Sequence, residues 1–120
     1  MARILVVDDE EEVRDAVADL LRAFGHEVEM AAGGHEAVLV LEAGGRFDGV
    51  LTDRRMPRVG GEEVLRAARR LLPAAKLVLM TGDNLSETDM AVAIAAGANE
   101  ILRKPFSVEE FSQLLTRLFP

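Results

Sequence analysis

The sequence predicts an α/β domain in which five parallel strands are covered by helices on both faces. Short aliphatic runs without polar alternation, typical of strands buried on both faces, alternate along the chain with apolar stripes at helical spacing. The links between them are short, which favours right-handed crossovers between parallel neighbours. Since 120 residues leave room for one core, we expect residues 1–120 to form a single domain.

The first strand is the aliphatic run Ile4–Val7. Apolar residues from Val13 to Phe24 recur at spacings of three and four, so they predict the first helix. Gly25 follows as a left-handed C-cap, the conformation in which glycine often ends a helix. The second strand is expected around Val28 and Met30.

The middle of the chain continues the alternation. The dipeptide Gly33-Gly34 opens a second helix, which Gly44-Gly45 ends. The third strand is predicted over Val50–Thr52. An apolar stripe over Val64–Leu72 predicts the third helix, and Pro73 halts it.

The last third holds two more strands and two more helices. Leu77–Met80 and Ile101–Leu102 read as the fourth and fifth strands. The last helix is expected over Val108–Leu118, behind a capping box that starts at Ser107. A fourth helix lies between the two strands, and its buried face is predicted to consist of Met90, Ala91, Ile94 and Ala95.

Composition limits the classes of partner. Lys and Arg number 14 and Asp and Glu 21, a formal net charge of −7, so this domain is not expected to bind nucleic acid. The chain has no cysteine, which rules out disulfides and thiolate metal sites. No apolar run is long enough for a signal peptide or membrane span, so we expect no membrane contact and a cytoplasmic location.

Polar residues with a chemical role follow four of the predicted strands. Asp8 and Asp9 follow the first strand, Asp53 the third, Thr81 the fourth and Lys104 the fifth. Each has an ordinary interpretation by itself: a solvated turn or helix cap, a β-forming threonine, a surface lysine. Ligands of open α/β sheets bind at the carboxyl ends of strands, and independent surface residues would rarely gather there.

Three carboxylates that meet at one edge repel one another and raise each other's pKa unless a cation intervenes. All-oxygen ligation favours a hard ion, and few carboxylates with room for water suit Mg²⁺ better than Ca²⁺. Lys104 is suited to hold a phosphate oxygen. Together these groups indicate phosphoryl transfer to Asp53.

The chain also resembles, over essentially its whole length, the response-regulator receiver domain of two-component signalling. That family has a flavodoxin-like fold with strand order 2-1-3-4-5. The resemblance rests on five motifs at family spacing: Val6-Val7-Asp8-Asp9, Asp53 with Met56-Pro57 and Gly61, Thr81-Gly82, Ala96-Gly97-Ala98, and Lys104-Pro105-Phe106.

The resemblance implies that Asp53 takes a phosphoryl group from a phosphohistidine of a sensor histidine kinase or a histidine phosphotransfer protein. Lys104 and the Thr81 hydroxyl would hold the phosphoryl oxygens, and the bond before Pro105 would be cis. The phosphorylated form would signal by a conformational change to an output partner that the sequence does not name. The implied Mg²⁺ ligands are Asp9, Asp53 and the backbone carbonyl of Arg55, with Asp8 acting mostly through water.

Some residues depart from the family pattern or stand outside it. Ile101 occupies the place of an aromatic switch residue, so an aromatic-rotamer readout is not expected. Arg55 and Asp83 flank the path of a hydrolytic water, and we expect them to pair and to slow phosphoryl loss. His26 and His35 are expected at the surface. The basic run on the third helix, expected to be a solvated face, consists of Arg66, Arg69 and Arg70.

Three alternatives compete with a receiver. A receiver-like docking module that is never phosphorylated would usually lack one of the five site residues. A small aspartyl-phosphate phosphohydrolase would carry a second acid where Arg55 stands. A nucleotide or flavin binder would have a glycine-rich turn in place of Asp8-Asp9-Glu10.

Overall fold

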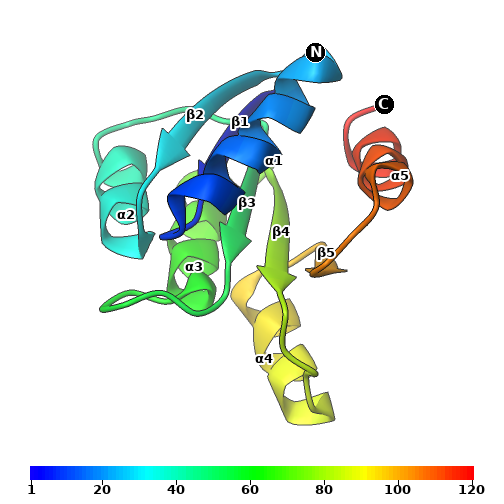
Figure 1. Ribbon diagram of the computed structural model, residues 1–120. Coiled ribbons are helices and arrows are strands. Elements are labelled where there is room, and N and C mark those ends of the chain that lie inside the picture. The colour runs from blue at the N-terminus through cyan, green and yellow to red at the C-terminus, as the bar shows by residue number, and fades with distance from the viewer.

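The computed structural model describes residues 1–120 without a gap. Its five parallel strands form one sheet in the order β2-β1-β3-β4-β5, as the family resemblance implied (Figure 1). The strands are β1 (Arg3–Val7), β2 (Glu27–Ala31), β3 (Gly49–Asp53), β4 (Lys76–Thr81) and β5 (Glu100–Arg103). The helices are α1 (Glu11–Ala23), α2 (Gly34–Glu42), α3 (Gly61–Leu71), α4 (Glu87–Ala96) and α5 (Val108–Leu118).

Helices cover both faces of the sheet, which makes three layers (Figure 1). Leu5 and Val7 of β1 pack with the buried residues of α2, α3 and α4. The side chains of Ile4 and Val6 lie on the opposite face of the sheet. There they pack with α1 and α5 around the fully buried Phe111. The alternation explains why β1 is aliphatic over Ile4–Val7, since neither of its faces is in water.

All ten predicted elements are present, with ends displaced by a few residues. The capping box at Ser107 is confirmed, and Gly25 has the left-handed φ of +90° that follows a helix end. α3 and α4 each begin three residues before the first residue predicted for them, at Gly61 and Glu87. Ser86 caps α4 and forms a second capping box with Asp89, which the sequence interpretation missed.

The predicted buried face of α4 is wrong. Met90 and Ile94 are 41% and 61% exposed, whereas Ala93 and Ala96 are buried against the core. Residues 90–96 of this helix are all apolar, so their periodicity does not indicate which side faces inward. The small alanines allow α4 to lie close to its neighbours, and the larger side chains remain in contact with water.

The basic run on α3 also differs from expectation, because Arg69 is a structural residue. Its guanidinium donates to the carbonyl oxygens of Pro73 (2.7 Å), Ala75 (3.0 Å) and Gly97 (2.9 Å) and to Oδ1 of Asn99 (3.0 Å). These acceptors lie beyond the ends of α3 and α4, where helix geometry provides no donors. Arg69 therefore joins the two helix ends.

The two histidines differ. His35 is exposed, as expected, but His26 is half-buried, because its Nδ1 accepts from the N–H of Ala2 (3.0 Å) and its ring lies 5.8 Å from that of Phe119. Burial lowers the pKa of His26, with the chain's amino group adding to the effect. Across the whole chain, no helix combines the length and apolar character that a membrane span requires.

Candidate functional site

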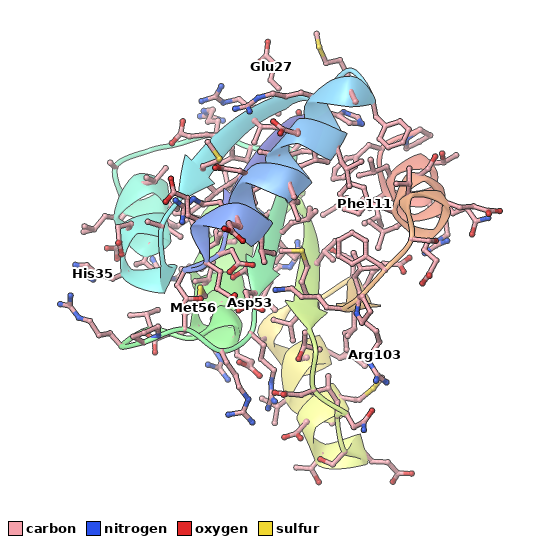
Figure 2. All side chains as sticks on the ribbon, in the orientation of Figure 1. Glu27, His35, Asp53, Met56, Arg103 and Phe111 are labelled. Atoms are coloured by element: carbon pink, nitrogen blue, oxygen red, sulfur yellow. The ribbon has the colours of Figure 1, made fainter.

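The predicted acids meet at the carboxyl edge of the sheet, where β1 and β3 are neighbours. Val7 is in register with Thr52, so Asp8 and Asp53 occupy equivalent positions at the ends of adjacent strands. Figure 2 shows Asp53 at the end of β3. One carboxylate oxygen from each of Asp8, Asp9 and Asp53 lies within 4.8 Å of the other two. Asp8 and Asp53 are buried, whereas Asp9 is exposed.

Lys104 brings the fifth strand into the site. Its Nζ lies 3.0 Å from Oδ2 of Asp8 and 3.0 Å from Oδ1 of Asp53. The bond between Lys104 and Pro105 is cis, as the resemblance implied. The N–H of Lys104 donates to the carbonyl of Thr81 (2.8 Å), which fixes the residue to the end of β4. Asp8, Asp9, Asp53 and Lys104 are thus one group of charges.

Asp8 and Asp9 differ in their partners. Oδ1 of Asp8 accepts from the N–H of Glu10 (3.0 Å), and its Oδ2 accepts from Lys104. The carbonyl of Asp8 accepts from the guanidinium of Arg14 (2.9 Å). Both carboxylate oxygens of Asp8 therefore have protein partners, while the exposed Asp9 makes no side-chain hydrogen bond.

Burial has the largest effect on the titration of Asp53. Burial raises the pKa of Asp53 because it penalises the charged carboxylate, and the charge of Asp8 adds to the rise while Lys104 opposes it. Burial by itself would lower the pKa of Lys104, but hydrogen bonds to Asp53 and Asp8 produce a net rise. The pKa values of both groups are therefore raised, that of Asp53 mainly by burial and that of Lys104 by its two acidic partners.

Thr81 and the following loop close the site on the β4 side. Thr81 is buried, and its Oγ1 accepts from the N–H of Asp83 (3.0 Å). A cleft of about 230 Å³ opens here. Its lining residues are Glu10, Asp53, Arg55, Thr81, Gly82, Asp83 and Lys104. All five strand-end residues of the prediction lie in or beside this cleft.

The expected pair of Arg55 and Asp83 is present, since Nε of Arg55 donates to Oδ2 of Asp83. This hydrogen bond is the main reason that the pKa of Asp83 lies below its ordinary value. Arg55 is the more exposed partner, with 74% of its side chain in contact with solvent. The pair spans the opening of the cleft.

Sequence reasoning missed Arg54. Its guanidinium contacts three acids: Nε lies 2.9 Å from Glu62, Nη2 3.2 Å from Asp89 and Nη1 3.4 Å from Asp83. The hydrogen bond with Glu62 is the first cause of the raised pKa of Arg54. The spacing of Ser86 and Asp89 could have located the start of α4, but no sequence pattern joins Arg54 to these acids.

The donor set fits a hard divalent cation. It consists of carboxylate oxygens, contains no nitrogen or sulfur ligand, and carries more negative charge than Lys104 compensates. The raised pKa of Asp53 indicates an unfavourable charge that a cation would relieve.

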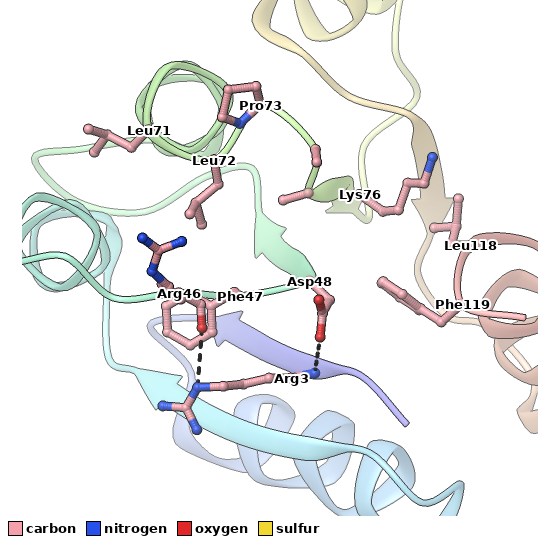
Figure 3. Close-up of a pocket in the computed structure, with 12 residues that line it drawn as sticks. Arg3, Arg46, Phe47, Asp48, Leu71, Leu72, Pro73, Lys76, Leu118 and Phe119 are labelled. Carbon is pink, nitrogen blue, oxygen red and sulfur yellow. Dashed lines mark hydrogen bonds between the residues drawn. The ribbon is translucent and has the colours of Figure 1, made fainter.

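A larger cleft of about 630 Å³ lies at the amino edge of the sheet, away from the acids (Figure 3). Arg3, at one side of this cleft, already has partners for its polar groups. The N–H of Arg3 donates to Oδ2 of Asp48 (2.8 Å), and its Nε donates to the carbonyl of Arg46 (3.2 Å). The guanidinium of Arg3 also lies 5.2 Å from the ring centre of Phe47. No predicted site residue lines this cleft.

A doubly wound sheet with an acidic cleft at its carboxyl edge defines a class of small α/β phosphoacceptor proteins, and comparisons with known proteins place the chain within it. The model of the response regulator receiver domain family matches residues 4–116. Response regulator MprA of Mycolicibacterium vanbaalenii is 44% identical over 119 residues, which cover 97% of this chain and 48% of that protein.

Solved structures agree. The chemotaxis protein CheY4 of Vibrio cholerae superposes with a TM-score of 0.89 at 33% identity and covers 99% of both chains. The response regulator TrrA of Thermotoga maritima, in a complex with Mg(2+)-BeF, superposes with a TM-score of 0.86 at 33% identity, over 99% of this chain and 100% of that one.

The chain therefore belongs to the response regulator receiver domain family. It is a two-component signalling module with a phosphoacceptor role. The chain spans about half the length of the curated relatives it matches.

Proposed function

We propose that residues 1–120 form a single receiver domain in which Asp53 takes the phosphoryl group from a phosphohistidine of a sensor histidine kinase or histidine phosphotransfer protein. The observation that supports this assignment is the convergence of Asp53 with Asp8, Asp9 and Lys104 at one cleft. A cytoplasmic location and an output partner, within or outside the same polypeptide, belong to the same proposal.

In the proposed step, a carboxylate oxygen of Asp53 attacks the phosphorus atom as the phosphorus–nitrogen bond of the donor breaks, and the imidazole leaves with the electron pair. Lys104 already lies 3.0 Å from Asp53, so its ammonium can follow an oxygen of the incoming group. Thr81 contributes a hydroxyl at the same edge. Catalysis consists of positioning and charge neutralisation, so the chain assists its own phosphorylation and dephosphorylation.

The proposed metal is Mg²⁺, held by Asp9, Asp53 and the backbone carbonyl of Arg55. Asp8 would act mostly through water, in keeping with its oxygens being engaged by Glu10 and Lys104. When bound, the ion neutralises charge on the carboxylates and on the phosphoryl oxygens.

A labelling experiment tests the assignment. The chain is incubated with Mg²⁺ and acetyl phosphate, and intact masses are compared for the wild type, Asp53→Asn and Asp48→Asn. Asp48 is an exposed acid at the opposite edge, so its variant is the control for loss of one carboxylate. We expect a phosphate-sized gain on the wild type and on Asp48→Asn alone. Equal labelling of Asp53→Asn would place the acceptor elsewhere, and no labelling of any chain would favour the docking module.

A further inference from the structure

Arg54 follows the proposed phosphoacceptor, yet the mechanism above does not use it. Only 15% of its side chain is exposed. Its three acidic partners come from three segments: Glu62 from the first turn of α3, Asp83 from the loop after β4, and Asp89 from the first turn of α4. One guanidinium therefore connects the end of β3 to both segments that follow Thr81.

The two sides of this network differ in how firmly they are held. The N–H of Arg54 donates to the carbonyl of Met80 (3.0 Å), and its carbonyl accepts from the N–H of Gly61 (2.9 Å). The loop over residues 82–86 is neither strand nor helix, and a Cβ at Gly82 would meet nothing within 4 Å. Arg54 is thus fixed at its backbone, whereas Asp83 lies on this loop and Asp89 lies in the helix that follows it (Figure 1).

The same loop holds the Thr81 hydroxyl. Oγ1 of Thr81 accepts from the N–H of Asp83 (3.0 Å), while the carboxylate of Asp83 is held by Arg54 and Arg55. Turning Thr81 toward a phosphoryl group on Asp53 requires Asp83 either to move with the hydroxyl or to release it. Contacts that fix Asp83 therefore oppose this movement.

We propose that Arg54 is a latch, a positioning residue whose pairs with Asp83 and Asp89 stabilise the loop position of the unphosphorylated chain. The inference rests on the proposed function. A group that binds one of two loop positions shifts their equilibrium by the difference in its interaction free energy. Weakening the latch should therefore favour the position that receives the phosphoryl group.

Binding of beryllium fluoride, an analogue of the phosphoryl group, tests the latch. Its affinity for the whole chain is measured by calorimetry at saturating Mg²⁺. Asp89→Asn removes the charge that faces Arg54 but keeps an oxygen for the cap bond from the N–H of Ser86. Glu87→Gln is the matched control, since it removes the same charge from the same helical turn without an ion pair. We expect Asp89→Asn to bind about threefold more tightly than the control, the scale of one partly exposed pair.

Arg54→Gln separates the latch from a general effect of charge. Loss of a positive charge near an anion site should by itself weaken anion binding, whereas loss of the latch strengthens it. We expect Arg54→Gln to bind beryllium fluoride at least as tightly as Asp89→Asn. The affinity for Mg²⁺ alone should be the same in Asp89→Asn and Glu87→Gln, because both variants remove one negative charge from the same helical turn and neither residue is a proposed ligand.

The outcomes separate the two proposals. If the wild type binds beryllium fluoride but Asp89→Asn equals Glu87→Gln, or if Arg54→Gln binds more weakly, the latch is wrong and the phosphoacceptor assignment is unaffected. If the wild type binds neither Mg²⁺ nor beryllium fluoride, the proposed function is wrong and the latch with it. Circular dichroism melts of each variant verify that the compared chains are folded.

Discussion

At the carboxyl edge of the sheet, three carboxylates gather with one ammonium group and two of them are buried, whereas at the amino edge Glu27 and Glu29 lie beside the exposed guanidinium of Arg3. Arg3 is 2.9 Å from Glu29, and both side chains are more than a third exposed. Asp53 is 3.0 Å from Lys104 but shares it with Asp8. Nitrogen–oxygen distances of about 3 Å thus occur both in a solvated ion pair at the amino edge and in a site with more acids than cations at the carboxyl edge.

The larger cleft lies at the amino edge, so the volume of a cleft does not indicate which edge binds a ligand. The larger cleft is lined by three cationic residues, Arg3, Arg46 and Lys76, and by one acid, so it has no surplus of acid that a metal cation could relieve. The smaller cleft retains an uncompensated charge that a ligand can relieve. Substitutions at the two edges should therefore have effects of different size and, for the acids, of different sign.

Binding of Mg²⁺ is expected to have the largest effect. A ligand at one hundred times its Kd stabilises the folded state by about 2.7 kcal/mol, which raises the melting temperature of a domain of this size by about 10 °C. Thermal melts monitored by circular dichroism measure this shift. Asp48→Asn should retain it and Asp9→Asn should lose most of it; an equal shift in both would remove the carboxyl edge as the metal site.

Asp53→Asn should stabilise the metal-free chain at neutral pH, by about 1 kcal/mol or about 4 °C in melting temperature. The pKa of Asp53 is raised, so its contribution favours folding below the unfolded pKa and is lost as the pH rises through the folded pKa. At neutral pH the ionised group is unfavourable. The gain should fall toward zero in acid, where the wild type is protonated; a gain that is constant with pH would contradict this explanation.

Arg55→Ala should shorten the lifetime of the acyl phosphate about twofold to threefold, because it opens the pair with Asp83 across the cleft entrance. Decay of the phosphorylated mass with time, after removal of the phosphodonor, measures the lifetime. Arg58→Ala, in the same loop but without an ion pair, is the control. An unchanged decay rate would show that the pair does not restrict water.

Glu29→Gln should have the smallest effect. It removes a solvated pair with Arg3 and should cost about 0.5 kcal/mol or less of the free energy of unfolding, measured by urea denaturation. Salt should reduce the loss further, since exposed charges are screened. A loss above 1 kcal/mol would mean that the amino edge also depends on its charges.

The sequence was sufficient for the strands, the helices and the strand-end residues, because these follow from hydrophobic period and from the common direction of parallel strands. It was not sufficient for contacts that depend on tertiary approach. Arg54 meets acids 8, 29 and 35 positions away, and Arg69 binds carbonyls beyond two helix ends. The predicted buried face of α4 was wrong for a related reason, because Ala93 and Ala96 face inward by close packing and not by greater hydrophobicity.

The central claim is that Asp53 carries the phosphoryl group, and peptide sequencing tests it directly. Wild-type chain treated with Mg²⁺ and acetyl phosphate is reduced with borohydride, which converts a phosphorylated aspartate to homoserine, and its peptides are read by tandem mass spectrometry. We expect homoserine at position 53 alone. Homoserine at position 8 or 9, or at none of the three acids, would contradict the account.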